Sequence, residues 1–260
     1  MKLKKNYSLT LMLATGTLFI TNATVRADDT DDRIEAAAQK SYVFKTYLAA
    51  DSIKTESKNG VVTLTGTVNE ASHKSLAQDT VESLPSVKSV NNQLVVKGEA
   101  PAEHSDTWIG MKIKTALLFH RNVSATGTSV SVTNGVVTLR GEATSLAQVE
   151  LTTEYAKDID NVKQVKNEMT VAKAPAKTTE TLGEAIDDAS ITAQVKSSLF
   201  SHRSTSVIKT KVSTTGGVVT ISGVAKNEAE KSLVTKLAMD VKGVTSVLNN
   251  MTIEVASTAK

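Results

Sequence analysis

Two histidine–arginine pairs are the residues of this sequence that most readily suggest chemistry. His120-Arg121 and His202-Arg203 each follow an apolar stretch with helical spacing. Two imidazoles could ligate a metal ion, or one could activate a serine such as Ser124 as a nucleophile. A metal site would require two separate domains to converge, and no Gly-x-Ser-x-Gly elbow occurs. We therefore interpret both pairs as structural, because a positive charge at a helix end complements the helix dipole and the last carbonyl groups.

Paired carboxylates and glycines are the remaining candidates for chemistry. Three carboxylate pairs lie at or before predicted helix starts: Asp28-Asp29, Asp31-Asp32 and Asp187-Asp188. Negative charge is favourable there, so we interpret these pairs as caps. The glycines form no phosphate-binding loop of the Gly-x-x-x-x-Gly-Lys-[Ser/Thr] type. The absence of cysteine excludes thiol nucleophiles and Cys-ligated metals. We predict a protein that is not an enzyme, with no catalytic residue, no metal and no cofactor.

Residues 1–27 have the pattern of a secretory signal peptide. Lys2, Lys4 and Lys5 precede an apolar run over 9–20, and 25–27 provide small or apolar residues at a cleavage site. The alternative is a retained membrane anchor, but the run is short and interrupted by threonine, whereas a span needs ~20 apolar residues. No cysteine follows the run, which excludes a lipoprotein anchor. We expect a secreted protein, located in the periplasm.

The net charge changes once this segment is removed. The whole chain carries 30 basic and 27 acidic residues, and residues 1–27 contain four of the basic ones and none of the acidic ones. The remaining chain therefore has 26 basic against 27 acidic residues. Nucleic-acid binding needs a concentrated basic surface. We expect no nucleic-acid partner.

One sequence unit occurs three times. Its signature is Asn-Gly-Val-Val-Thr-Leu-x-Gly at 59–66 and 134–141, and Gly-Gly-Val-Val-Thr-Ile-Ser-Gly at 216–223. The shifts of 75 and 82 residues need no gaps, and they also align Asn92, Asn167 and Asn249 near the ends of the units. Such a length exceeds that of solenoid repeats and indicates a string of small domains. The first unit has Lys45-Thr46 where the others have His-Arg.

The periodicity within a unit predicts its elements. Ile109, Ile113, Ala116 and Leu117 lie on one face of a helix. Alternating valines then flank Asn-Gly, the strongest short signal for a two-residue hairpin turn. A capping-box pattern of Ser145 and Gln148 opens a second helix, and a last strand follows.

The predicted fold is α+β: three tandem α-β-β-α-β units, each a three-stranded sheet with two helices on one face. The predicted domain boundaries are as follows: signal peptide 1–27, units 28–98, 106–172 and 187–256, linkers 99–105 and 173–186, tail 257–260. The second linker is the longer and more polar, so we expect units two and three to move more freely relative to each other.

The repeated signature, placed after an amphipathic helix and followed by Val-x-x-Val-x-Asn, resembles the BON domain family. The resemblance covers all three units. It implies the α-β-β-α-β fold, a role at the bacterial envelope, and no enzyme motif. Members of this family are associated with osmotic stress, phospholipid membranes and chaperone-like assistance to exported proteins.

The third unit has the most cationic sequence. The formal charges are −2 for 28–98, 0 for 106–172 and +3 for 187–260. Four basic residues near its first helix and strand could contact anionic lipid headgroups, at about 1 kcal/mol per charge: Lys196, Arg203, Lys209 and Lys211. The alternative is a solvated face. Trp108, the one tryptophan, could contact a membrane interface or cover a seam between units.

These features lead to two functional hypotheses. The first is a periplasmic osmotic-stress protein that makes weak multivalent contacts with anionic phospholipid surfaces or exported client proteins, as tandem units raise avidity. The second is a structural adaptor for one specific envelope protein or cell-wall partner.

Overall fold

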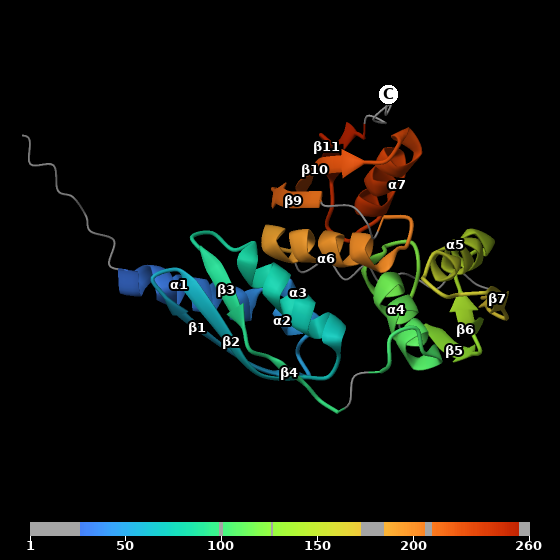
Figure 1. Ribbon diagram of the computed structural model, residues 1–260, viewed down its shortest axis with the longest axis horizontal. Coiled ribbons are helices and arrows are strands. Elements are labelled where there is room, and N and C mark those ends of the chain that lie inside the picture. The colour runs from blue at the N-terminus through green and yellow to red at the C-terminus, as the bar shows by residue number, and fades with distance from the viewer. Residues whose placement is uncertain (1–26, 99–100, 126, 173–184, 206–209, 255–260) are drawn as a thin grey trace, which may run out of the picture.

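The computed structural model describes residues 27–98, 101–125, 127–172, 185–205 and 210–254. They form three α+β units in tandem (Figure 1). The predicted signal peptide apart from Ala27, the predicted tail and most of the second linker lie outside these ranges. Among the described residues, no helix has the length and apolarity that crossing a membrane demands.

Each unit follows the predicted order of helix, strand, strand, helix and strand, which confirms the α+β prediction. Unit one contains α1 (Ala27–Lys40), α2 (Tyr42–Thr46), β1 (Ser52–Lys58), β2 (Val61–Val68), α3 (Ala71–Glu82), β3 (Ser89–Asn92) and β4 (Val95–Val96). Unit two contains α4 (Asp106–Phe119), β5 (Thr128–Thr133), β6 (Val136–Ala143), α5 (Leu146–Lys157), β7 (Gln164–Asn167) and β8 (Thr170–Val171). Unit three contains α6 (Asp188–Ser201), β9 (Thr210–Thr215), β10 (Val218–Ala225), α7 (Glu228–Met239), β11 (Ser246–Asn249) and β12 (Thr252–Ile253).

The hairpin of each unit supplies one edge strand and the central strand of its sheet. β1, β5 and β9 pair antiparallel with β2, β6 and β10. The turn residues Asn134 and Gly135 have φ angles of 53° and 80°, the left-handed conformation that a tight two-residue hairpin requires. The last strand then pairs parallel with the central one, for example β11 with β10. This parallel pairing requires a crossover, and the second helix of each unit provides it.

The last strand of every unit is split in two, which the sequence pattern did not predict. In unit three, the Asn249 side chain donates to the Lys231 carbonyl and the Thr235 hydroxyl at 2.9 and 2.8 Å, and accepts from the Met251 N–H at 3.0 Å. The turn at this asparagine moves Met251 into the core, where it is 2% exposed. Asn92 and Asn167 make the corresponding bonds. The aligned asparagines therefore fix the last strand to the second helix.

Two of the six aspartates predicted as helix caps, Asp31 and Asp188, bind a hairpin turn instead. Asp187 does cap α6, since its side chain accepts from the Ser190 N–H. The neighbouring Asp188 instead accepts the N–H groups of Gly216 and Gly217, at 2.7 and 2.9 Å. Asp31 and Asp106 bind the hairpin turns of their units in the same way. This carboxylate therefore ties the first helix to the hairpin.

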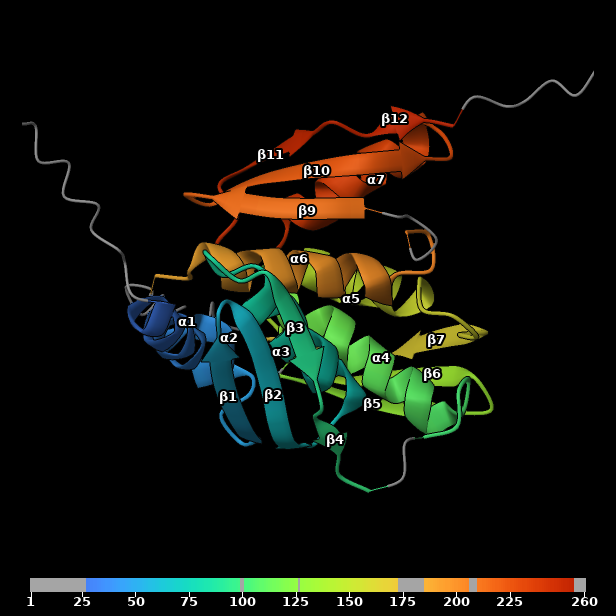
Figure 2. The ribbon, with the colours of Figure 1, turned by 60° about the vertical axis from the view of Figure 1, so that its left-hand side comes forward.

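The three units pack around α6, which lies between the sheet of unit three and the other two units (Figure 2). Ten of its residues are buried, and several of them are small or polar, such as Ala193, Ser190 and Ser198. Small side chains allow neighbouring helices to approach closely, and α6 contacts α3, α4 and α7. One helix therefore belongs to the core of its own unit and to the junctions with both others.

Candidate functional site at the junctions between units

Units two and three meet through reciprocal contacts. The backbone N–H of Arg121 donates to the carbonyl of Asp240, and that of Arg203 to the carbonyl of Asp158, both at 2.8 Å. Arg203 lies 82 positions after Arg121, and Asp240 lies 82 positions after Asp158. This is the shift that aligns the repeats of units two and three, so the two bonds are equivalent. The guanidinium of Arg121 also donates to the Val241 carbonyl at 2.8 Å. The same surface of each unit thus faces the other, as in an isologous dimer.

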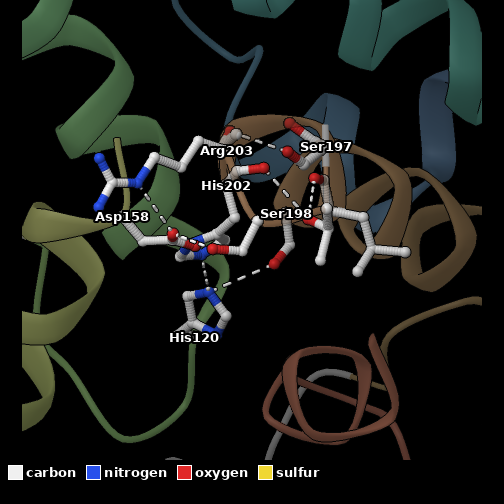
Figure 3. A network of polar contacts seen from close by, with 10 residues as sticks. His120, Asp158, Ser197, Ser198, His202 and Arg203 are labelled. Carbon is white, nitrogen blue, oxygen red and sulfur yellow. Dashed lines mark hydrogen bonds and ion pairs between the residues drawn. The ribbon is translucent and has the colours of Figure 1, made fainter. Parts of the chain in front are cut away.

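Two histidines approach each other edge-on at the centre of this junction (Figure 3). The Nε2 atoms of His120 and His202 are 3.3 Å apart, and the residues are 0% and 1% exposed. The Nδ1 atom of His202 is 3.0 Å from a carboxylate oxygen of Asp158, and that of His120 is 3.0 Å from Asp240. The Ser198 hydroxyl lies 3.2 Å from His120 Nε2. Each histidine therefore contacts an aspartate of the other unit.

The aspartates are held by further donors. Asp240 accepts hydrogen bonds from the Tyr155 hydroxyl at 2.6 Å and from the Asn122 amide, and Tyr155 stacks on His120 with ring centroids 4.1 Å apart. The hydroxyl of Ser204 donates to Asp158, and the Arg203 guanidinium is 3.5 Å away. These contacts fix both carboxylates toward the imidazoles.

Burial and hydrogen bonding shift the proton affinities within this cluster. Burial lowers the pKa of His120, with the Asp240 carboxylate opposing the effect. Burial alone would raise the pKa of Asp158, but hydrogen bonds from His202 and Ser204 outweigh it and leave that pKa lowered. Burial and the bond to Asp240 raise the pKa of Tyr155. His120 is thus neutral and Asp158 ionised at neutral pH.

The structure corrects the interpretation of the His-Arg pairs. We expected each pair to complement the end of its own helix, and we did not expect the two domains to converge at the histidines. The pairs instead bridge units two and three, although no group of three His, Cys, Asp or Glu in the described part of the chain could hold a metal. One sequence signal could have revealed this junction. The two units that have a His-Arg pair also have an aspartate at aligned positions, Asp158 and Asp240, whereas unit one lacks the pair and has Ser83 there.

Unit one joins the others through α6 and the end of α4. The Lys196 ammonium lies 3.0 Å from Asp79 and 3.8 Å from Glu82, both on α3. Burial raises the pKa of Asp79, with Lys196 opposing the effect. The ring of Phe119, 1% exposed, packs edge-on against Tyr47 with centroids 5.3 Å apart. Lys196 thus serves a contact within the protein.

The four basic residues predicted as a lipid-contacting group do not lie on one open face. Lys196 pairs with unit one, and Arg203 lies beside Asp158 at the junction with unit two. Lys209 lies outside the described residues. Lys211 is exposed on β9. Only Lys211 among the described three therefore lies away from the junctions.

Trp108 is half-buried and lies at a seam. It packs against the core of unit two, and it lines a groove of about 460 Å³ between the three units. The Lys112 ammonium lies 5.2 Å from the centre of the Trp108 ring and 4.3 Å from that of Phe200, which is 68% exposed. Burial lowers the pKa of Lys112. The groove thus combines two aromatic rings with a cation that lies over them.

The outer sheet face of unit three carries apolar residues that sequence reasoning missed. Val224 and Leu248 are 52% and 54% exposed, and Lys211 shares their face by strand alternation. Unit two has Ser129, Glu142 and Lys166 at the three corresponding positions. The signal was present in the sequence as apolar residues at outward strand positions. This face differs from its counterpart in unit two by being apolar and cationic.

The fold and its junctions define a tandem-repeat protein made of three copies of one small α-β-β-α-β domain. The model of the BON domain matches residues 30–98, 105–173 and 187–255. The chain belongs to the BON domain family.

Two curated proteins are similar to the chain. It is 35% identical over 146 residues to Osmotically-inducible protein Y of Escherichia coli K12, which covers 56% of this chain and 71% of that protein. It is 31% identical over 144 residues to an uncharacterised protein in the gshII 5' region of Anaplasma centrale, covering 55% of this chain and 91% of that protein. Among solved structures, CdsD, a structural protein of the type III secretion system of Chlamydia trachomatis, is 17% identical. The match covers 88% of this chain and 94% of that one, with a TM-score of 0.25.

Proposed function

We propose that this protein is a non-enzymatic, periplasmic osmotic-stress protein of the bacterial envelope that contacts anionic phospholipid surfaces weakly and through several points. The similarity to Osmotically-inducible protein Y and the signal-peptide pattern of residues 1–27 support the compartment and the stress response.

The outer sheet face of unit three is the observation that carries the lipid contact. Lys211 supplies a positive charge, and within the described ranges it has no acidic partner at ion-pair distance. Val224 and Leu248 lie on the same face and are more than half exposed. A basic residue near an anionic surface contributes about 1 kcal/mol, and exposed apolar groups add the burial of their area. One such face binds weakly, so a second contact must come from another unit or from Lys209.

Co-sedimentation with vesicles tests this proposal. We expect the protein to pellet with vesicles containing phosphatidylglycerol, less so at high salt, and not with pure phosphatidylcholine. The triple variant Lys211→Ser, Val224→Glu, Leu248→Lys gives unit three the residues of unit two and should abolish pelleting.

A matched control reverses the exchange. Ser129→Lys, Glu142→Val and Lys166→Leu together place the unit-three residues on unit two, and they should increase pelleting. Unchanged pelleting in both triple variants would refute the lipid contact at this face. All six positions are on outer sheet faces, so neither variant alters the core.

The groove at the junction of the units favours a second candidate, the binding of exported clients or of one protein partner. Exposed aromatic residues are typical anchors at protein interfaces, and Phe200 lies at the edge of this groove. Substoichiometric protein should then suppress the aggregation of an unfolded exported protein, and Phe200→Ser should weaken the effect. A pull-down dominated by one envelope protein, without lipid dependence, would favour the adaptor hypothesis instead.

A further inference from the structure

The paired histidines at the junction of units two and three approach each other through their Nε2 atoms. If both atoms carry a hydrogen, the hydrogens repel each other, and if neither does, the two lone pairs repel each other. Each Nδ1 atom lies 3.0 Å from an aspartate oxygen. His202 Nδ1 is hydrogen-bonded to Asp158, whereas His120 Nδ1 is close to Asp240 without hydrogen-bond alignment. A bare nitrogen at 3.0 Å would repel the carboxylate, so we assign a hydrogen to both Nδ1 atoms. The question is then how many hydrogens the two Nε2 atoms carry, which lie 3.3 Å apart.

Three proton counts are possible between the Nε2 atoms, and one of them fits the contacts. With no proton, two lone pairs face each other, and only His120 can accept from the Ser198 hydroxyl, 3.2 Å away. With one proton, the ring of His202 donates to that of His120, and neither two lone pairs nor two hydrogens face each other between the Nε2 atoms. With two protons, two imidazolium cations face each other across 3.3 Å in a buried site.

The charges around the pair favour a single added proton. Asp158 and Asp240, at the ends of α5 and α7, face the rings with two negative charges. The Arg203 guanidinium at the end of α6 partly offsets Asp158 at 3.5 Å. Near the end of α4, Arg121 binds backbone carbonyls of unit three. Tyr155 of α5 donates to Asp240 as a neutral phenol.

We infer that His120 and His202 hold one proton between them, and that a second proton separates units two and three. The junction is therefore a contact within the chain that is closed near neutral pH and opens in mild acid. The Nε2 atom of His120 also faces the Ser198 hydroxyl, 3.2 Å away, so we assign His120 as the acceptor and His202 as the donor of the shared hydrogen.

Unit one cannot form such a contact, because it has Lys45 and Ser83 at the positions of the histidine and the aspartate. Opening would therefore affect one junction only. It would expose residues that are now buried there, including both histidines.

The distance between units two and three tests the inference directly. The chain contains no cysteine, so Ser129→Cys and Ser213→Cys, on the exposed faces of β5 and β9, accept two spin labels without background. We expect a single narrow distance distribution at pH 7.5 and a second, longer population that grows as the pH falls toward 5. For a one-proton transition, the ratio of open to closed molecules rises up to tenfold per pH unit.

The variant His120→Gln separates proton binding from packing. Its amide oxygen can accept from His202, and its amide nitrogen can donate to Asp240, but it cannot gain a proton. We expect the closed distance at pH 7.5 and no acid-induced opening. The matched control is His73→Gln in unit one, which removes another His–Asp pair, of 2.6 Å, and should open like the unsubstituted protein.

A second measurement holds even if His120→Gln does not fold. Nitrogen-15 spectra of the histidine side chains in the unsubstituted chain should show one imidazolium and one neutral ring for this pair at pH 7. Two neutral or two charged rings at that pH would overturn the inference. An unchanged distance between the labels down to pH 5 would overturn it equally.

Discussion

Replacing Asn249 by alanine should lower the stability of unit three by about 3 kcal/mol. The side chain makes three hydrogen bonds, to the Lys231 carbonyl, the Thr235 hydroxyl and the Met251 N–H. A typical neutral hydrogen bond contributes about 1 kcal/mol net. Met251 is 2% exposed, so its N–H would lose its acceptor in a place that water does not readily reach. Alanine cannot replace any of these bonds.

Amide hydrogen exchange is the appropriate assay, because three units need not unfold in one step. We expect the protected amides of β10 and β11 to exchange roughly a hundredfold faster in Asn249→Ala, since 1.36 kcal/mol corresponds to a factor of ten. Amides of β6 in unit two should be almost unaffected.

The control is Asn250→Ala, the next residue along the chain, which is exposed and bonds to Ile221 through its backbone only. It should leave exchange in unit three unchanged. The reasoning fails if Asn249→Ala accelerates exchange by less than about fivefold, or if Asn250→Ala has the same effect. The latter result would show that backbone effects of alanine, and not the three bonds, determine the stability of the split strand.

Three further predictions concern the contacts within and between units. Asp188→Ala removes two charge-assisted hydrogen bonds to the hairpin turn and should destabilise unit three by about 2–3 kcal/mol in the same exchange assay, whereas Asp188→Asn should lose less. Phe119→Ala truncates a buried ring shared with the core of unit one and should cost about 3–5 kcal/mol, seen as a lower thermal midpoint and faster proteolysis between units one and two. Because burial lowers the pKa of His120 from its ordinary 6.5, the closed junction of units two and three binds fewer protons than the open one below about pH 6.5. As the pH falls below that value, its stability should therefore decrease by up to about 1.4 kcal/mol per pH unit, and His120→Gln should remove this slope in an acid titration.

The repeating unit could be predicted from the sequence because its determinants are local. The Asn134-Gly135 turn, the alternation of the valines around it and the helical spacing of Ile109 and Ile113 each depend on neighbours within a few residues. Backbone sterics and side-chain periodicity act at that range, so the order of elements and the α+β class followed. The split of the last strand did not, because Asn249 bonds to a helix carbonyl 18 residues earlier.

The tertiary structure alone decided which residues meet between units. The His120 and His202 rings are 82 residues apart in the chain and are brought to 3.3 Å by the packing of α4 against α6. The same packing paired Lys196 with Asp79, 117 residues away, and removed it from the surface on which charge counting had placed it. Net charge per unit is additive along a sequence, but the exposure of each charge depends on which faces the units bury. The sequence therefore determined the domain, and the arrangement of the three copies determined where its chemistry lies.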